Sequence, residues 1–490
     1  MNPTLSFNGS IATLTGNLPK STHENLYQLL SWQDSNISYQ NSRHQNSRWR
    51  APEDPTRSAY DLKTHRFPTG LIPRVVLRLK QLGYDPELVK QYTSLTPTEP
   101  EIPEWAFDHQ RQAVGLALQH RRCLIQAPAG SGKTYVLVFI ASCFPEAQIL
   151  VTIHNSDIFR GLYRTFSSYF DEPIGRVGDS KKNWERITIG MQKSLALYAQ
   201  TDFADRLNKV DVLLTDECHH FGCNEGSKIS LALTNTSYRV GVSATKDRGD
   251  GADLLVEGAF GPLALTIPEM EMVKLGVIHA PQAYFLTVPA LSLETTAVIE
   301  QEHRNNLREG YYRKGIVQNP YRNQLAVDVV LAFLSCSTRS GNALIMVERL
   351  EHGSEIQRLL AAAGKKVDFI EGTNTSNEVR KAQITALNNQ EIDALIATSI
   401  TDEGVDIPGL ELVVNLAGGS SQRAIIQRAG RSGRIDRTGS KTRSLYVDFE
   451  DLEPAFLSKN YRNRRQHLNA RFPNCSSTTT LNKLKVIFNA

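Results

Sequence analysis

Cysteine is scarce in this chain: six cysteines are scattered over 490 residues. Thiols so few and so widely spaced do not build a disulfide framework, which excludes the small secreted scaffolds that depend on one. No apolar run approaches the roughly 20 residues of a membrane-spanning helix, and the first residues lack the basic and apolar regions of a signal peptide. We therefore expect a cytoplasmic protein without a membrane partner.

A strong net charge is absent as well. The formal net charge is only +4, but residues 459–490 contain seven Lys or Arg and no Asp or Glu, and residues 1–100 contain eleven against eight. The centre of the chain is therefore acidic and its ends are basic. This distribution suits the binding of a polyanion, although a basic terminal segment that is merely solvated and disordered is an equal alternative.

The length exceeds what one hydrophobic core usually supports, so we expect two or three domains. From residue 121, short β-branched apolar runs alternate with helical stretches, and the pattern repeats from residue 341. Such alternation predicts an α/β fold with two parallel sheets, each wrapped by helices. The expected strands are residues 123–126, 148–153, 210–215 and 239–243 in the first sheet, and 343–347, 366–370, 392–398, 411–416 and 444–449 in the second.

The first hundred residues have a different character. They contain an expected strand at residues 11–15, a helix opened by the capping-box spacing of residues 21–24, and an amphipathic helix at residues 71–82. We predict a small N-terminal α/β domain. The expected domain boundaries are 1–95 for this domain, 96–103 for a linker rich in proline and threonine, 104–265 for the first lobe, 266–458 for the second lobe and 459–490 for a basic C-terminal tail.

A phosphate-binding loop is predicted between the first expected strand and an apolar helix. Its residues are Ala127, Pro128, Ala129, Gly130, Ser131, Gly132, Lys133 and Thr134. In such loops the backbone amides face the phosphates, while the lysine neutralises the β- and γ-phosphates and the hydroxyl of the last residue ligates Mg2+. Lys133 and Thr134 are therefore candidate nucleotide and metal ligands.

Asp216 and Glu217 follow another expected strand, at the edge of the sheet where ligands bind in α/β folds. Asp216 is expected to hold Mg2+ and Glu217 to activate the attacking water; the alternative is a plain helix cap. The hydroxyls of Ser243 and Thr245, after the next strand, are placed to hydrogen-bond this acidic motif. A zinc site built on residues 218–223 is a further alternative, but the spacing matches no common zinc set.

The third candidate element is the octad at residues 427–434, which contains Gln427, Arg431 and Arg434. Arginines in this arrangement suit arginine fingers that reach a γ-phosphate when two lobes close, with Gln427 positioning water or phosphate. In isolation, a basic surface helix is the better interpretation. Upstream, Gly404 permits close approach of the backbone to a nucleotide, and Asp406 is placed to accept a ribose hydroxyl.

Taken in order and at these distances, the motifs resemble those of superfamily 2 helicases and translocases over residues 104 to about 450. The run Ser243-Ala244-Thr245-x-x-Arg248-x-Asp250-Gly251, together with the glutamine at the start of the octad, is similar to the group around XPB, RecG and restriction motors. Residues 60–62 and 67–71 resemble the small domain that precedes the motor in phage recombination helicases of the UvsW type.

The resemblance implies tandem RecA-like lobes, ATP and Mg2+ as cofactors, and adenine recognition by Gln110. It also implies strand contacts within residues 187–195, whereas no individual strand contact is carried over to residues 151–156. The sequence departs from the family at Phe107-Asp108-His109-Gln110, where Arg-x-Tyr-Gln is usual, and at Val151-Thr152-Ile153, which lacks the usual proline. Neither departure touches the residues expected to hydrolyse ATP.

By resemblance, this enzyme would remodel branched DNA, including Holliday junctions, forks, D-loops and R-loops, in recombination, repair or replication. It would bind duplex and branched DNA without sequence preference, alongside recombination or replication proteins, and in the host cytoplasm if a phage encodes it. Three alternatives stay open: an RNA helicase, a motor subunit of a restriction or defence complex, and a nucleic-acid-binding scaffold with an inactive ATPase.

Overall fold

The computed structural model describes residues 2–35, 37–38, 53–199, 201, 204–244, 251–371, 375–398, 407, 409–433 and 443–489. The chain forms two compact units, one made of Met1–Pro128 with Gly132–Ile267 and the other of Ala129–Ser131 with Pro268–Ala490. Each unit is described by itself. In the described part of the chain, no helix is long and apolar enough to cross a membrane.

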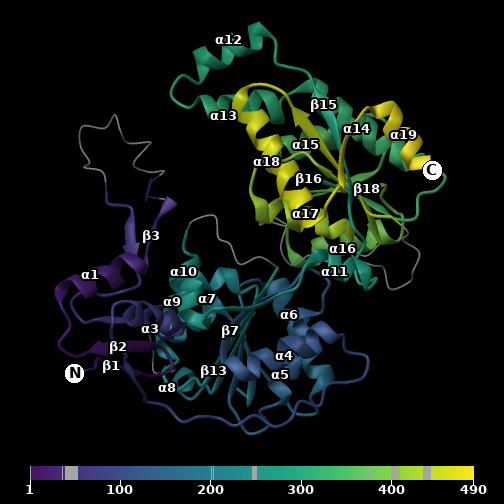
Figure 1. Ribbon diagram of the computed structural model, residues 1–490. Coiled ribbons are helices and arrows are strands. Elements are labelled where there is room, and N and C mark those ends of the chain that lie inside the picture. Colours follow the sequence, from purple (N-terminus) through teal and green to yellow (C-terminus); the bar gives the residue numbers. More distant parts are fainter. Residues whose placement is uncertain are drawn as a thin grey trace. The chain divides into compact units, whose positions relative to one another are not determined.

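The first unit is built on an eight-stranded sheet, counted over the described residues (Figure 1). Its order is β10 (Lys181–Asn183), β9 (Ile174–Gly178), β11 (Ile187–Met191), β8 (Ile149–Ile153), β12 (Val212–Asp216), β13 (Tyr238–Ser243), β7 (Arg122–Gln126) and β14 (Leu263–Thr266). All neighbours are parallel except the edge hairpin β9–β10. The expected strands of this lobe are present, with ends shifted by two residues at most.

Helices cover both faces of this sheet, which explains why its strands are apolar along their whole length. Alternate side chains serve opposite cores: Ile149 and Val151 of β8 face one, and Leu150 faces the other. The first core is closed by α4 (Asp108–His120), α5 (Lys133–Ser142) and α6 (Ser156–Tyr169). The second is closed by α7 (Gln192–Tyr198), α8 (Ala204–Asn208), α9 (Asn224–Ala232) and α10 (Asp253–Phe260).

The N-terminal region is a small α/β domain with its own core, as expected. Its sheet has the order β5 (Arg66–Pro68), β2 (Ile11–Thr15), β1 (Thr4–Phe7), β6 (Glu87–Lys90), and β3 (Ser31–Gln33) pairs with β4 (Thr56–Ser58). The helix α3 (Ile72–Gln81) matches the prediction. The predicted capping box is wrong: α1 (Lys20–Leu29) begins before it, after Pro19, and no side chain caps its first turn. A proline fixes φ near the helical value, so the helix starts without a capping side chain.

This small domain is joined to the first RecA-like sheet by buried hydrogen bonds. Nη2 of Arg239, a fully buried residue of β13, donates to Oγ of Ser10 at 3.0 Å. Nη2 of Arg122 donates to the carbonyl of Gly9 at 2.6 Å, and Arg74 of α3 forms an ion pair with Glu257 of α10. Within the expected linker, the backbone N–H of Thr98 donates to the carbonyl of Cys143. The domain and its linker are therefore fixed parts of the first unit.

The second unit is a seven-stranded parallel sheet, counted over the described residues. Its order is β17 (Val367–Ile370), β18 (Ala394–Thr398), β16 (Asn342–Val347), β19 (Leu410–Asn415), β20 (Leu445–Asp451), β15 (Gln282–Val288) and β21 (Ser476–Thr479). One face packs against α14 (Pro320–Leu334), α15 (Leu350–Ala362) and α19 (Leu481–Asn489). The other packs against α16 (Asn377–Asn388), α17 (Gln422–Gly433) and α18 (Ala455–Arg471). The predicted α/β fold with two tandem RecA-like lobes is confirmed.

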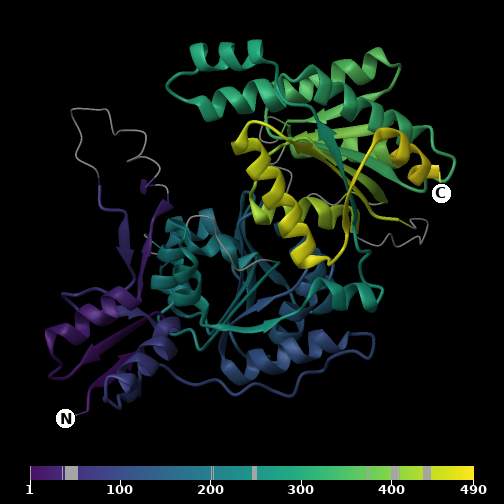
Figure 2. The ribbon, with the colours of Figure 1, turned by 45° about the horizontal axis from the view of Figure 1, so that its top comes forward.

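Three short helical elements precede α14 in this unit: α11 (Glu269–Lys274), α12 (Leu293–Glu302) and α13 (Leu307–Tyr312), the last continued by a π-helical turn at Arg313–Val317. The C-terminal residues belong to the lobe itself. Figure 2 shows α18 and the following strand, in yellow, folded with the second sheet. The alternative that residues 459–490 are disordered is therefore wrong, because β21 pairs with β15 and α18 buries Tyr461, Arg464 and Leu468.

Candidate functional site

The predicted phosphate loop connects β7 to α5; its residues Ala129–Ser131 are grouped with the second unit and the others with the first. Gly130 and Gly132 adopt positive φ angles of 86° and 77°, which L side chains rarely adopt. A Cβ at Gly132 would collide with the amide of Gln110. The glycines are thus required by the backbone path, which curls so that α5 starts directly behind the loop.

Lys133 is held inside this loop. Its Nζ donates to the carbonyl oxygens of Ala127 and Pro128, at 3.3 and 3.2 Å, and lies 3.9 Å from Oε1 of Glu217. The sequence therefore brings a loop cation and a strand-end carboxylate together across 84 residues. The half-buried Thr134 follows in the first turn of α5.

Asp216 is the last residue of β12 and is 5% exposed. Burial raises the pKa of Asp216, and the negative charge of Glu217 raises it further, while Lys133 opposes the shift. A nearby cation would favour the ionised form of this carboxyl. Glu217 has a left-handed backbone, with φ 48°, and its N–H donates to Oδ1 of Asp216 at 2.9 Å. A strained conformation of this kind is common at functional sites.

The expected hydrogen bond between the strand-end hydroxyl and the acidic motif is present. Oγ of Ser243 donates to Oε2 of Glu217 at 3.2 Å. Nδ1 of His219 lies 2.7 Å from the same hydroxyl and 3.4 Å from Oε2 of Glu217. These contacts tie β12 to β13. Thr245, the other candidate hydroxyl, lies outside the described residues.

Two further histidines meet beside the acidic motif. The ring of His154, just after β8, stacks on the ring of His220 with centroids 3.5 Å apart. Burial raises the pKa of the two neighbouring thiols, Cys218 and Cys223, which favours their neutral form. Sγ of Cys223 also accepts the N–H of Gly226 at the start of α9. The sequence does not predict the histidine stack, because the two residues are 66 positions apart.

Gln110, the expected adenine contact, is buried at the start of α4. Its Oε1 accepts the N–H of Phe107 at 3.1 Å, and its Nε2 donates to the carbonyl of Gly132 at 3.3 Å. The ring of Phe107 is 40% exposed. The glutamine is thus anchored on the phosphate loop while an aromatic face stays accessible. Its role in base recognition stays a prediction.

The octad falls in the second unit, on α17. Arg428 and Arg431 are 4% and 6% exposed, and Nη1 of Arg428 donates to Oδ1 of Asn415 at 3.1 Å. The interpretation of the octad as a solvated basic helix is therefore wrong, because Arg428 and Arg431 are buried and Arg428 bonds Asn415 of β19. Gln427 is half-buried on the same helix. Arg434, Gly404 and Asp406 lie outside the described residues.

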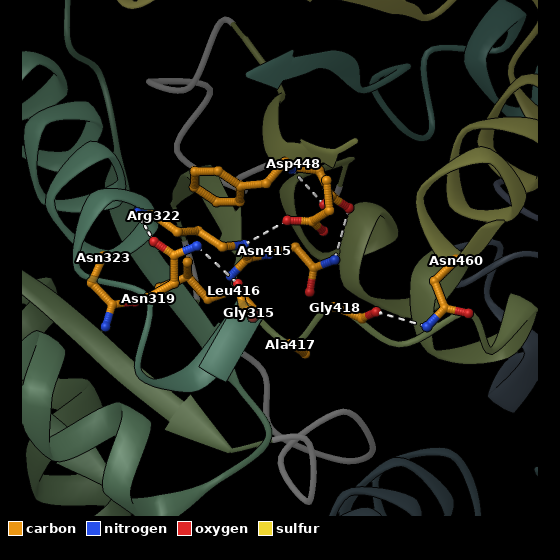
Figure 3. Close-up of polar contacts among 12 residues, drawn as sticks. Gly315, Asn319, Arg322, Asn323, Asn415, Leu416, Ala417, Gly418, Asp448 and Asn460 are labelled. Carbon is orange, nitrogen blue, oxygen red and sulfur yellow. Dashed lines mark hydrogen bonds and ion pairs between the residues drawn. The ribbon is translucent and has the colours of Figure 1, made fainter. Parts of the chain in front are cut away.

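A buried polar cluster in the second unit was not predicted from the sequence. Figure 3 shows part of it, with Arg322 of α14, Asn415 at the end of β19 and Asp448 within β20. Arg464 completes it through an ion pair with Asp448. The available signal was the cluster of carboxylates at the end of β20, where Asp448 and Asp451 are buried, since buried carboxylates require partners.

Two protein families match the chain on either side of the joint between the units. The type III restriction enzyme, res subunit family matches residues 104–248, and the helicase conserved C-terminal domain family matches residues 325–436. This order places the loop and acidic motif in the first match and α17 in the second. The chain is a superfamily 2 helicase. As such, it is an ATP-hydrolysing enzyme whose relatives act on nucleic acid.

Known proteins resemble this helicase at low identity. Putative helicase 22 of Sulfolobus islandicus filamentous virus is 26% identical over 339 residues, covering 65% of this chain and 59% of the viral protein. The ATP-dependent DNA helicase uvsW of Enterobacteria phage T4 is 22% identical, covering 75% of this chain and 72% of the relative. The structure of S. cerevisiae Dbp5 bound to RNA and ADP BeF3 has the same fold, with a TM-score of 0.55, 15% identity, and coverage of 78% and 92%.

Proposed function

We propose that this helicase is a DNA translocase that remodels branched DNA, with the hydrolytic residues in the roles that follow. Residues 127–134 bind the phosphates of ATP through backbone amides and Lys133, and Gln110 contacts the adenine. Glu217 orients and deprotonates the attacking water, and Ser243 holds its carboxylate in place. The observation that carries the catalytic assignment is the convergence of Lys133, Glu217 and Ser243 in one unit.

The donor set suits Mg2+. The buried carboxyl of Asp216 has a raised pKa, so a divalent cation would compensate the charge that burial disfavours. We assign Asp216 and the Thr134 hydroxyl as the residues that hold the ion. Mg2+ supplies neutralisation of phosphate charge, and the protein supplies the position of its ligands.

In the second unit, we propose that Gln427, Arg431 and Arg434 act on the γ-phosphate and the water. Gly404 and Asp406 are proposed to contact the nucleotide backbone and ribose. These assignments rest on the family resemblance. The packing of α17 supports a fixed orientation for Arg431, since a mobile surface helix would not hold an arginine in one place.

The DNA substrate is proposed from the T4 relative, which is named as a DNA helicase and covers most of this chain. We propose that the N-terminal domain, residues 1–95, binds duplex or branched DNA. Because it is fixed to the first unit through Arg239 and Arg122, a load on that domain would be transmitted to β13 and β7. Recombination or replication proteins in the cytoplasm remain the expected partners.

A second function is favoured by one finding. The match to the restriction enzyme res subunit suits a motor subunit of a restriction or defence complex. That protein would hydrolyse ATP on duplex DNA and translocate without resolving junctions. An RNA helicase is the third option, because the RNA-bound Dbp5 shares the fold.

The deciding experiment is ATP hydrolysis by the full chain with single-stranded DNA, duplex DNA, a four-way junction or RNA, combined with gel assays of junction dissociation. We expect stimulation by DNA, strongest on the junction, and dissociation that requires ATP. Strong stimulation by RNA with none by branched DNA would contradict the proposal. Stimulation by duplex DNA without junction dissociation would favour the restriction motor.

Two variants test the catalytic assignment. Lys133→Ala or Glu217→Gln should abolish turnover and leave junction binding in gel shifts largely intact, because neither side chain is assigned to DNA. Wild-type hydrolysis in either variant would show that the site is misassigned.

A further inference from the structure

Two buried arginines hold the backbone that leads into α17. Arg322 of α14 and Arg464 of α18 are both fully buried. Nη1 of Arg322 donates to the carbonyl of Leu416 at 3.0 Å, and Nη1 of Arg464 donates to the carbonyls of Gly418 and Gly419 at 3.0 and 3.3 Å. All three carbonyls belong to residues 416–421, the approach segment between β19 and α17. Figure 3 shows Leu416 and Gly418 of this segment, with Asn460 of α18 also reaching Gly418.

Arg464 uses its whole guanidinium. Besides the two carbonyls, its Nε donates to the carboxylate of Asp448 at 3.1 Å. Its Nη2 donates to the carbonyl of Phe449 at 2.9 Å and to Oδ2 of Asp451 at 3.3 Å. Arginine carries five N–H donors in a rigid planar fork, so these acceptors match it fully. A lysine would keep the charge, but its three donors sit on one atom and cannot replace the fork.

Asp448 connects Arg464 to the octad through Asn415. Its Oδ2 accepts from Nδ2 of Asn415 at 2.8 Å, and Oδ1 of Asn415 accepts from Nη1 of Arg428 at 3.1 Å. All of these side chains are buried. A continuous chain of hydrogen bonds therefore runs from Arg464 on α18 through Asp448 and Asn415 to Arg428 on α17. Buried polar networks of this kind select one conformation for each member.

The far end of α17 is also fixed. The carbonyl of Gly433 accepts the N–H of His279 at 2.7 Å, and Oγ of Ser444 donates to Oγ of Ser432 at 2.9 Å. Residues three apart on a helix share one face, so the anchored Arg428 also fixes the face that carries Arg431.

We propose that Arg464 is a positioning residue for ATP hydrolysis: it clamps the approach segment and, through Asp448 and Asn415, sets the place of Arg428 and Arg431. This inference rests on the proposed role of Arg431. It concerns a residue outside both family matches, which end at residues 248 and 436. A displacement of about 1 Å in a catalytic group can cost about 100-fold in rate. The proposed nucleotide ligands Gln110, Lys133 and Thr134 belong to the other unit, so binding of ATP should not change.

The test compares Arg464→Lys with Arg322→Lys. Arg322 is a matched control because it is equally buried, pairs with Asp451 at 3.1 Å and bonds the same segment at Leu416. We expect Arg464→Lys to lower kcat about 10- to 100-fold with KM for ATP unchanged. Arg322→Lys should lower Tm to a similar degree with a much smaller loss of kcat. Equal losses of kcat in the two variants would overturn the proposal.

A second variant decides the matter even if Arg464→Lys does not fold. Asn415→Ala keeps the clamp of Arg464 on residues 416–421 and cuts only the link from Asp448 to Arg428. It should lower kcat like Arg464→Lys, and the two losses should be non-additive in the double variant. Wild-type kcat in Asn415→Ala, or strict additivity, would overturn the proposal.

Arg431→Ala separates this inference from the proposed function. If Arg431→Ala hydrolyses ATP at the wild-type rate, the assigned role of Arg431 is wrong. If Arg431→Ala is slow while Arg464→Lys behaves like Arg322→Lys, only the positioning role of Arg464 is wrong.

Discussion

The hydroxyl of Ser243, at the end of β13, donates a hydrogen bond of 3.2 Å to the carboxylate of Glu217, at the end of β12. His219 shares the same hydroxyl at 2.7 Å. Ser243 thereby fixes the direction of the proposed general base, which must face the attacking water in one orientation.

Removal of this hydroxyl should slow hydrolysis without blocking binding. Ser243→Ala is expected to reduce kcat about tenfold, since one hydrogen bond to a charged group contributes about 1.5 kcal/mol. KM for ATP should change little. Ser237→Ala, at the other end of the same strand region, serves as the control and should leave kcat unchanged. Identical kcat values for Ser243→Ala and wild type would remove Ser243 from the mechanism.

The phosphate loop gives a second prediction. Gly132 combines a φ of 77° with the close approach of the Gln110 amide. Gly132→Ala should therefore weaken ATP binding at least about tenfold, since it strains the loop and displaces Gln110. Gly115 lies inside α4 with open space around its Cα, so Gly115→Ala should retain binding and stabilise the fold by about 0.5–1 kcal/mol. A titration with a fluorescent ATP analogue measures the Kd of both variants. Equal Kd values for Gly132→Ala and Gly115→Ala would contradict the prediction.

How much of the structure can be predicted from the sequence depends on how far apart in the sequence the interacting residues lie. Residues 127–134 were predictable because their chemistry is local: glycines with positive φ, a lysine and a hydroxyl must follow each other directly. The pairing of β21 with β15 joins residues about 190 positions apart, and no local pattern encodes it. The same limit applies to Arg464, whose neighbours in sequence are basic and polar while its partners, Asp448 and Gly418, come from other elements.

Local sequence patterns also gave two wrong predictions, each where a constraint or contact from outside the pattern outweighed it. The residues 21–24 have the spacing of a capping box, yet Pro19 sets the start of α1 one residue earlier. The octad has the composition of a surface helix, yet Arg428 and Arg431 are buried, and Asn415 of the second sheet supplies a partner for Arg428. In both cases a contact or constraint from outside the motif outweighed its own propensity.

The hydrogen bonds of the buried Arg239 predict that its contact with the N-terminal domain stabilises the first unit. Its guanidinium donates to Ser10, to Ser230 and to the carbonyl of Leu233. Arg239→Met should lower the free energy of unfolding of the first unit by about 2–4 kcal/mol, because several buried acceptors lose their donor. Arg358→Ala, which breaks an exposed pair with Glu355 in the second unit, should leave the unfolding of the first unit unchanged. Urea unfolding measures both, and equal losses would show that the domain is only loosely attached.

The lowered pKa of His352 predicts that the second unit loses stability as the pH falls. Burial, and then the charge of Arg322, lowers the pKa of His352 to about 3, and its Nε2 lies 2.9 Å from Oδ1 of Asn323. In the unfolded chain the pKa is about 6.5. Between these values the unfolded state binds the extra proton, so the stability from neutral His352 is fully present above about pH 6.5 and is lost as the pH falls toward 3. By pH 5 this loss amounts to about 2 kcal/mol.

His352→Gln removes the titration and keeps an amide that can reach Asn323. The variant should unfold with a shallower dependence on pH between about 6.5 and 5 than the wild type. The difference between the two proteins at pH 8, where the histidine is neutral in both states, reports the packing change alone and is the internal control. Urea denaturation at several pH values, monitored by a signal from the second unit, gives the pH dependence of the free energy of unfolding for both proteins. Parallel slopes in the two proteins would mean that His352 takes up its proton without unfolding the lobe.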